Sequence, residues 1–265
     1  MTRTHGVAGI ILALVVAAGG PAAADVWDNT TETDDAIGSD NRLIHGAVQV
    51  HDLASPGGVQ DLDFFFLDLS NSGSYEVLVE GHTGDLDFIT GGTNSDIVRT
   101  DINGNVLQDA SGSNALVPVR WKMATGGGNS IQYIRVRSSN CGTGCNTSDQ
   151  YTIRFRETTY SIPRFNNSAT QTTILLVNNI ASGTCSGVDF NFYNSNGAFL
   201  GTSTQSINPA TTLVLNTATL PFAAGVGGMV KVLHTCPYGS LTGKAVAVEP
   251  GTGFTFDSPM LPVIY

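Results

Sequence analysis

Short segments of alternating apolar and polar residues, separated by turn-forming residues, dominate this chain of 265 residues. The segments YEVLVEG at 75–81 and YTIRFRE at 151–157 have the two-residue period of a strand with one buried face. Between such segments lie stretches rich in Gly, Asn and Asp, among them SNSGS, DINGN and ATGGGN. No segment after residue 24 has the sustained period near 3.6 residues that a helix requires. The pattern predicts an all-β fold.

The expected strands form two series. The first series is expected at 42–50, 63–68, 74–80, 85–90, 96–100, 116–123, 131–136 and 151–157. The second is expected at 171–178, 188–193, 199–203, 211–216, 228–233 and 243–249. Several short strands at this spacing are typical of a β-sandwich. We predict two sandwiches in tandem, jelly-roll or immunoglobulin-like, with a boundary near residue 159; one larger sandwich is the alternative.

The N-terminal segment has the parts of a secretion signal. Arg3 is followed by 12 uncharged residues at 7–18, then by Gly, Pro and the small residues Ala22, Ala23 and Ala24. The uncharged run is too short to cross a bilayer, which takes roughly 20 apolar residues. We therefore predict a cleaved signal peptide at 1–24, a mature chain without a membrane span, and export to the periplasm, the cell surface or the medium. The mature chain would comprise domains at 25–158 and 159–265.

Acidic residues are concentrated in the first predicted domain. Residues 25–158 contain 19 acidic and 8 basic residues, whereas residues 159–265 contain three of each. This distribution repels nucleic acid and offers no basic patch for it, so nucleic acid is excluded as a partner. Solubility explains an acidic exported domain, and cation binding is the alternative.

The four cysteines are Cys141, Cys145, Cys185 and Cys236. Four cysteines allow three pairings, and their positions favour Cys141–Cys145 and Cys185–Cys236, each within one half of the chain. Disulfides are expected in an exported protein. A zinc site is the weaker alternative, because the spacing is irregular and only His234 lies close to a cysteine.

Two acidic motifs in the first half resemble a known family. They are QDLDFFF at 60–66, which precedes the strand YEVLVEG, and GDLDF at 84–88. Their order resembles that of the bacterial pre-peptidase C-terminal domain family over residues 25–158. The resemblance implies a compact, non-catalytic β-sandwich that accompanies secreted enzymes and coordinates calcium in some relatives. The chain departs from the family where GDLDF ends in Phe88 and ITGGTNSDIV replaces a Tyr-rich stretch, and neither half contains a recognisable peptidase.

The same motifs contain the candidate metal ligands. Asp61 and Asp63 form one pair two residues apart, and Asp85 and Asp87 form another, so each pair points to one face of its strand. Four converging carboxylates would repel one another unless a hard cation such as calcium lay between them. The alternative is that these carboxylates accept backbone hydrogen bonds in turns. No other cofactor is indicated.

Two Asn-Gly sequences predict hairpin turns. DINGN at 101–105 also has the spacing of the first calcium ligands of an EF-hand loop, but its Gly is at the fourth position and no Glu follows at the twelfth. The second Asn-Gly, at 196–197, lies between the expected strands 188–193 and 199–203. Both are therefore interpreted as hairpin turns.

No catalytic motif is found, since G-x-S-x-G, H-E-x-x-H and G-x-x-x-x-G-K are all missing. In the second half, Phe254 and Phe256 share a strand face; such a pair is more often core, but it could contact a sugar or a partner protein. The sequence thus predicts a secreted, non-enzymatic protein that binds a glycan or a surface protein. The alternative is a self-associating subunit of an extracellular assembly, and a secreted hydrolase is the third hypothesis.

Overall fold

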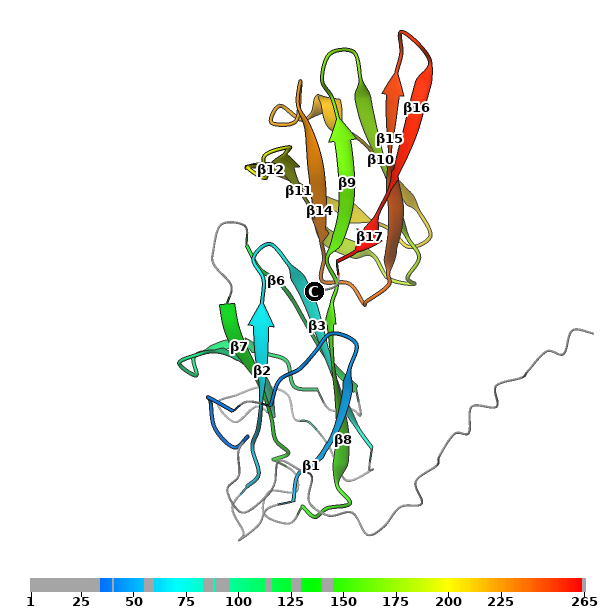
Figure 1. Cartoon of the computed structure of the whole chain (residues 1–265). Coiled ribbons are helices and arrows are strands. Elements are labelled where there is room, and N and C mark those ends of the chain that lie inside the picture. The colour runs from blue at the N-terminus through cyan, green and yellow to red at the C-terminus, as the bar shows by residue number, and fades with distance from the viewer. Residues whose placement is uncertain are drawn as a thin grey trace, which may run out of the picture.

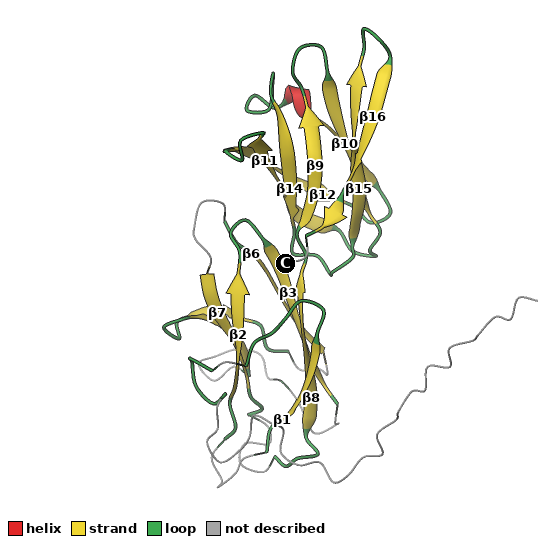
Figure 2. Ribbon diagram, viewed as in Figure 1, coloured by secondary structure: helices red, strands yellow, loops and turns green. Residues whose placement is uncertain are grey.

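The computed structural model describes residues 34–39, 41–54, 60–82, 88, 96–112, 116–124, 130–139 and 145–263. The predicted signal peptide lies outside these residues. The described part is built almost entirely of strands, and its one helical element is the short 3-10 turn η2 (Thr217–Thr219) (Figure 2). The all-β prediction is confirmed. No helix within the described ranges is long and apolar enough to cross a membrane.

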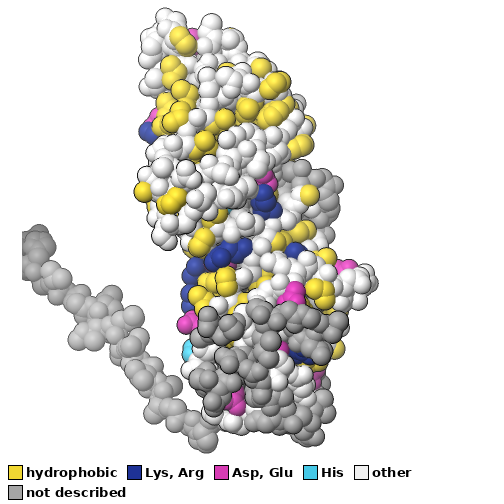
Figure 3. Space-filling view, turned by 180° about the vertical axis from the view of Figure 1, so that it is seen from behind, with side chains coloured by type: hydrophobic (Ala, Val, Ile, Leu, Met, Phe, Trp, Pro, Cys, Tyr) yellow, Lys and Arg dark blue, Asp and Glu magenta, His cyan; other side chains and the backbone are white. Residues whose placement is uncertain are grey.

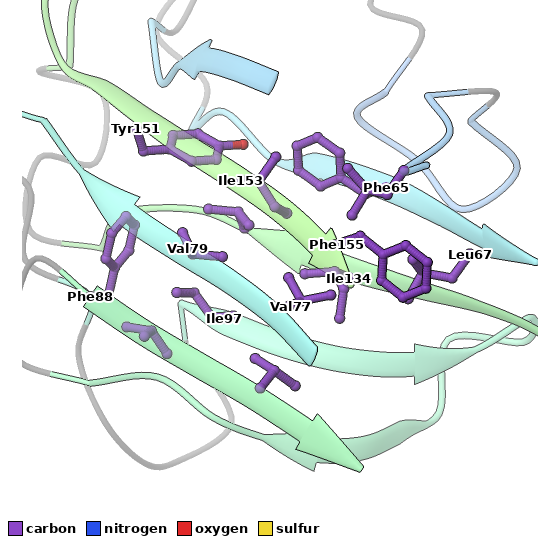
Figure 4. Close-up of a cluster of buried hydrophobic side chains, with 14 of the residues drawn as sticks. Phe65, Leu67, Val77, Val79, Phe88, Ile97, Ile134, Tyr151, Ile153 and Phe155 are labelled. Carbon is purple, nitrogen blue, oxygen red and sulfur yellow. The ribbon is translucent and has the colours of Figure 1, made fainter. Parts of the chain in front are cut away.

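The first half of the chain contains two antiparallel four-stranded sheets (Figure 1). Its strands are β1 (Val48–Asp52), β2 (Asp63–Leu69), β3 (Ser74–Gly81), β4 (Ile97–Asp101), β5 (Val106–Asp109), β6 (Leu116–Lys122), β7 (Ser130–Val136) and β8 (Gln150–Glu157). The strand orders are β1-β8-β3-β6 and β2-β7-β4-β5. Alternate side chains of both sheets, among them Phe65, Val77, Ile134 and Ile153, form one buried cluster between them (Figure 4).

The second half contains a five-stranded and a four-stranded antiparallel sheet. Its strands are β9 (Tyr160–Asn166), β10 (Thr172–Asn179), β11 (Cys185–Asn194), β12 (Phe199–Ile207), β13 (Thr212–Asn216), β14 (Gly227–Leu233), β15 (Leu241–Glu249), β16 (Phe254–Pro259) and β17 (Leu261–Pro262). The strand orders are β12-β11-β14-β9-β17 and β13-β10-β15-β16. A second buried cluster, which includes Ile162, Leu175, Phe190 and Val230, is formed from both sheets.

Both predicted hairpin turns are confirmed. Gly104 and Gly197 have φ angles of 82° and 79°, a conformation that glycine adopts without strain. Asp101 accepts backbone hydrogen bonds from Asn103 (2.8 Å) and Asn105 (2.9 Å) with Oδ1, so it organises the turn between β4 and β5. The pKa of Asp101 is lowered, mainly by the hydrogen bond from the Asn105 side chain and next by the one from the Asn105 backbone.

The predicted boundary near residue 159 lies in an almost unbroken pair of strands. β8 ends at Glu157 and β9 begins at Tyr160, with only the buried Thr158 and Thr159 between them. Thr158 donates its backbone N–H to Ser74 O (2.8 Å), and Thr159 Oγ1 accepts the N–H of Ser74 (2.8 Å). The connection is therefore hydrogen-bonded to β3. It is not a free linker.

Further contacts join the two halves at this junction. Glu76 of β3 is 1 % exposed; its Oε2 accepts hydrogen bonds from Arg120 Nε (2.6 Å) and from the backbone N–H of Tyr238 (3.1 Å). The Arg156 guanidinium lies over the Tyr238 ring, 4.7 Å from its centroid. Tyr238 of the second half is thus held by charged groups of the first half.

A second group of junction contacts involves β11. Ser72 Oγ and the hydroxyl of Tyr193 are 2.6 Å apart, and Asn191 Nδ2 donates to the same Ser72 oxygen (3.2 Å). Lys122 of β6 forms an ion pair with Asp189 and donates to the carbonyl oxygen of Gly187 (2.7 Å). Polar contacts therefore cross the junction at several points around the connection between β8 and β9.

Candidate functional site

Buried acidic groups gather at one end of the first core. Asp34, His51 and Asp63 each have a potential ligand atom within 4.8 Å of the others, and all three are buried. His51 is the last but one residue of β1, Asp63 begins β2 in the facing sheet, and Asp34 precedes both strands. Tyr151 of β8 donates its hydroxyl to Asp63 Oδ2 (2.5 Å). We call Asp34, His51 and Asp63 the acidic cluster.

The surroundings of the acidic cluster hold its groups in place. His51 is opposite Tyr151 in the β1–β8 ladder, and their rings stack with centroids 5.7 Å apart. His51 Nε2 is 3.0 Å from Gln49 Oε1. Burial, followed by the charge and hydrogen bond of Asp63, raises the pKa of Tyr151 above its ordinary value, and the charges of Asp34 and Asp61 act in the same direction. The phenol therefore stays protonated and serves Asp63 as a hydrogen-bond donor.

The acidic cluster differs from the predicted metal site. Asp61 and Asp63 are both buried, and Asp61 Oδ1 accepts the N–H of Leu62 (3.0 Å), as the turn alternative expected. Asp85 and Asp87 lie outside the described residues. Asp34 and His51 are not among the predicted ligands, because no local motif in the sequence connects either of them with Asp63. That Asp85 and Asp87 of the GDLDF motif converge on Asp61 and Asp63 stays a prediction.

The donor atoms of the acidic cluster suit a divalent cation. Calcium takes 6–8 oxygen ligands, and Asp34 and Asp63 supply carboxylates from separate segments. Asn41, which is fully buried, donates Nδ2 to Asp34 Oδ2 (3.2 Å), and its Oδ1 accepts no hydrogen bond from the described residues. The His51 nitrogens are better suited to zinc or another transition metal. The cluster therefore fits a cation, with oxygen donors in the majority.

The cysteines follow the predicted pairing as far as they are described. Cys185 and Cys236 form a disulfide with their Cα atoms 5.6 Å apart. Cys145 is also disulfide-bonded, and its predicted partner Cys141 lies outside the described residues. His234 lies beside the first disulfide, where burial lowers its pKa to about 4 and its Nδ1 accepts the N–H of Cys236 (3.2 Å). With both sulfurs in a disulfide, this group is not a zinc site.

Phe254 and Phe256 lie at the end of the second half that is distant from the junction (Figure 1). The ring of Phe254 is on the surface, since 65 % of the residue is exposed, so the expectation that it belongs to the core is wrong. Phe256 is half-buried, and the guanidinium of Arg164 lies over its ring, 4.5 Å from the centroid. The two rings border one depression of about 170 Å³. We call Phe254, Phe256 and Arg164 the aromatic end.

Polar side chains surround the aromatic end. Gln171 and Glu249 line the same depression, and Asn166 Nδ2 donates to Gln171 Oε1 (2.5 Å). A neighbouring depression of about 510 Å³ is bordered by Arg164, Asn166 and Asn194. Arg164, which is stacked on Phe256, lines both depressions, so the two depressions adjoin each other at this side chain.

A cavity of about 640 Å³ lies at the junction of the halves. Its lining includes Arg42, His45, Asp68, Tyr75, Glu157 and Lys231. Burial raises the pKa of Glu157 to about 7, although a hydrogen bond from Thr159 and the charge of Lys231 oppose this effect. Burial lowers the pKa of His45, whose Nδ1 accepts the backbone N–H of Glu157 (2.8 Å). Two titratable groups thus adjoin the connecting strand.

Comparison with known proteins does not assign a family or a function. No family model matches the chain, and no characterised protein is similar to it in sequence. The resemblance of residues 25–158 to the pre-peptidase C-terminal domain family therefore stays a prediction.

Proposed function

We propose that this chain is a non-enzymatic, exported binding protein whose aromatic end recognises an extracellular glycan. The observation that carries the proposal is the exposed ring of Phe254 beside the Arg164–Phe256 stack. An exposed phenylalanine contributes little to folding. Its apolar face is available for stacking on the C–H face of a sugar ring.

The surroundings of Phe254 support a polar ligand of modest size. Arg164 is held over Phe256, so it loses little conformational freedom when it donates hydrogen bonds to hydroxyl groups. Gln171 and Glu249 offer further donors and acceptors at the same depression. A large protein interface would instead favour a broad apolar centre, so we favour a glycan over a protein partner.

The proposal is tested on a glycan array with the protein purified after export from a secreting host. We expect binding to a defined set of glycans, with at least a tenfold loss of affinity in Phe254→Ala. The control is Ile180→Ala, because Ile180 is 66 % exposed in the same half but outside the aromatic end. The proposal is wrong if no glycan binds, or if both variants bind as tightly as the wild-type protein.

We also propose that the acidic cluster binds calcium as a structural ion. Its support is the convergence of Asp34 and Asp63, which belong to separate segments, next to the buried amide oxygen of Asn41. A bound ion would relieve the repulsion between the carboxylates. It would also tie residue 34 to β2, so calcium would stabilise the first half.

Thermal unfolding with and without metal tests the calcium proposal. At 100 times its dissociation constant, calcium should raise the free energy of unfolding by about 2.7 kcal/mol in the wild-type protein. Asp34→Asn should abolish this gain, whereas Asp68→Asn should keep it, because Asp68 is an exposed carboxylate of β2 paired with Arg42. Stabilisation by zinc alone would show that His51 makes this a transition-metal site and would refute calcium.

A further inference from the structure

The second half contains a long stretch without charge. Residues 190–230 include no Asp, Glu, Lys, Arg or His. The stretch contains β12 and β13, which are the edge strands of the two sheets of this half. In Figure 3 the upper half of the molecule accordingly shows few charged side chains among uncharged and hydrophobic ones.

The other edges in the described part of the chain are protected against pairing with another strand. Each contains a charged residue or a proline: Asp52 in β1, Asp68 in β2, Asp109 in β5, Lys122 in β6, Asp257 in β16 and Pro262 in β17. Charges and prolines at edges oppose the addition of a foreign strand. β12, with the sequence FLGTSTQSI, and β13, with TLVLN, contain neither. The unprotected edges are thus confined to one side of the second half.

β12 is the better strand for pairing. It has nine residues, whereas β13 has five. Thr202, Thr204 and Ser206 are exposed on it, and Phe199 at its start is 46 % exposed. The hydroxyl groups of Thr202 and Thr204 donate to Asn191 and Asp189 of β11, so neither residue needs a neighbouring strand to satisfy its hydroxyl. Thr–Thr pairs across antiparallel strands are favourable.

The charge distribution favours a second copy of this chain as the partner. Residues 25–158 have a net charge of −11, whereas residues 159–265 are neutral, so the first halves of two copies repel each other and their second halves do not. β9, which continues from β8 of the acidic half, lies in the same sheet as β12. Antiparallel pairing of two β12 strands therefore directs the two acidic halves to opposite ends of the pair.

We propose that two copies associate through β12, which pairs antiparallel with its own copy about a two-fold axis near Ser203. Thr202 of each copy then lies opposite Thr204 of the other. The five-stranded sheets of both copies join into one sheet. Because the contact is the same on both copies, it closes as a dimer and leaves no β12 edge for further addition.

The oligomeric state of the exported protein tests this proposal. Sedimentation over about 1–200 μM should show a reversible doubling of mass, within the usual range for weak dimers. The variant T202K/T204K should be a monomer at all these concentrations, because it places lysines directly opposite each other. The control V48K/V50K adds the same charge to the exposed positions of β1 and should still form dimers.

A charge-swap experiment separates a broken interface from a misfolded variant. T202E/T204E alone should also be monomeric, but an equimolar mixture with T202K/T204K should form a heterodimer, since each lysine then faces a glutamate. The proposal is overturned by a monomeric wild-type protein, by dimers of T202K/T204K, or by a mixture that stays monomeric. Growth beyond a dimer would overturn it too, because that requires an open-ended contact.

Discussion

Glu157 lies at the junction cavity with only 5 % of its surface exposed, and burial raises its pKa to about 7. Its protonated form is therefore favoured in the folded protein more than in the unfolded chain, where its pKa is near 4.5. The contribution to stability is fully present below pH 4.5 and is lost as the pH rises through about 7. A carboxyl group beside the connecting strand thus gives the folded protein a specific dependence on pH.

We predict that Glu157→Gln removes this loss of stability. Between pH 4.5 and 8 the wild-type protein should lose at most about 3 kcal/mol through this group, at 1.36 kcal/mol per pKa unit. Urea unfolding at both pH values gives the free energy of unfolding of the wild type and of the variant. His234 titrates in the opposite direction in both proteins, so its effect cancels in the difference between them. Glu80→Gln, at an exposed position, is the control and should follow the wild-type curve. Equal pH slopes in wild type and Glu157→Gln would contradict the prediction.

At the scale of the element, β9 is a strand that the sequence pattern does not predict. Its sequence, YSIPRFN, contains Pro163 and follows the predicted boundary near residue 159. No strand is expected there from the sequence, yet it is an internal strand between β14 and β17. The β14–β9 register shifts between Gly228 and Val230, where Met229 faces Pro163 and Arg164. A proline is tolerated at such an irregularity because no regular ladder hydrogen bond is required of it.

The same irregular strand positions the aromatic end. Arg164 follows Pro163 on β9, and its guanidinium reaches Phe256 on β16 of the other sheet. The pattern of apolar and polar residues along 160–166 does not predict that the side chains of Arg164 and Phe256 are in contact. The aromatic pair on β16 could be proposed from its spacing, but its exposure and its arginine partner depend on how the two sheets end.

At the scale of the whole molecule, Glu76 is the buried charged group among the contacts that join the two halves. Its carboxylate is within 3.7 Å of Arg156 Nη1 as well as 2.6 Å from Arg120 Nε, and it accepts the N–H of Tyr238. Tyr238 follows the Cys185–Cys236 disulfide by two residues, so this contact ties the cross-linked part of the second half to β3. The halves are expected to unfold together, and the Glu76 contact is expected to contribute most to this coupling because its carboxylate is buried.

We predict that Glu76→Ala separates the unfolding of the halves. Removing one partner of a buried ion pair costs 3–5 kcal/mol, and about 3 kcal/mol is expected here because both arginines are about one quarter exposed. Calorimetry should show one transition for the wild-type protein and two for the variant. Asp68→Ala removes an exposed ion pair with Arg42 and should leave a single transition. Two transitions in the wild-type protein would contradict the coupling.

By itself, the sequence determined the all-β class, most strand positions, both Asn-Gly turns and the Cys185–Cys236 disulfide. The strands and turns depend on residues a few positions apart in the sequence. Four cysteines allow only three disulfide pairings, so a pairing within each half could be proposed. Only the tertiary structure decided that Asp34 and His51 meet Asp63, that Arg164 covers Phe256, and that β12 is an unprotected edge. These features join residues from separate segments, and the order of strands in a sheet has no counterpart in a two-residue period.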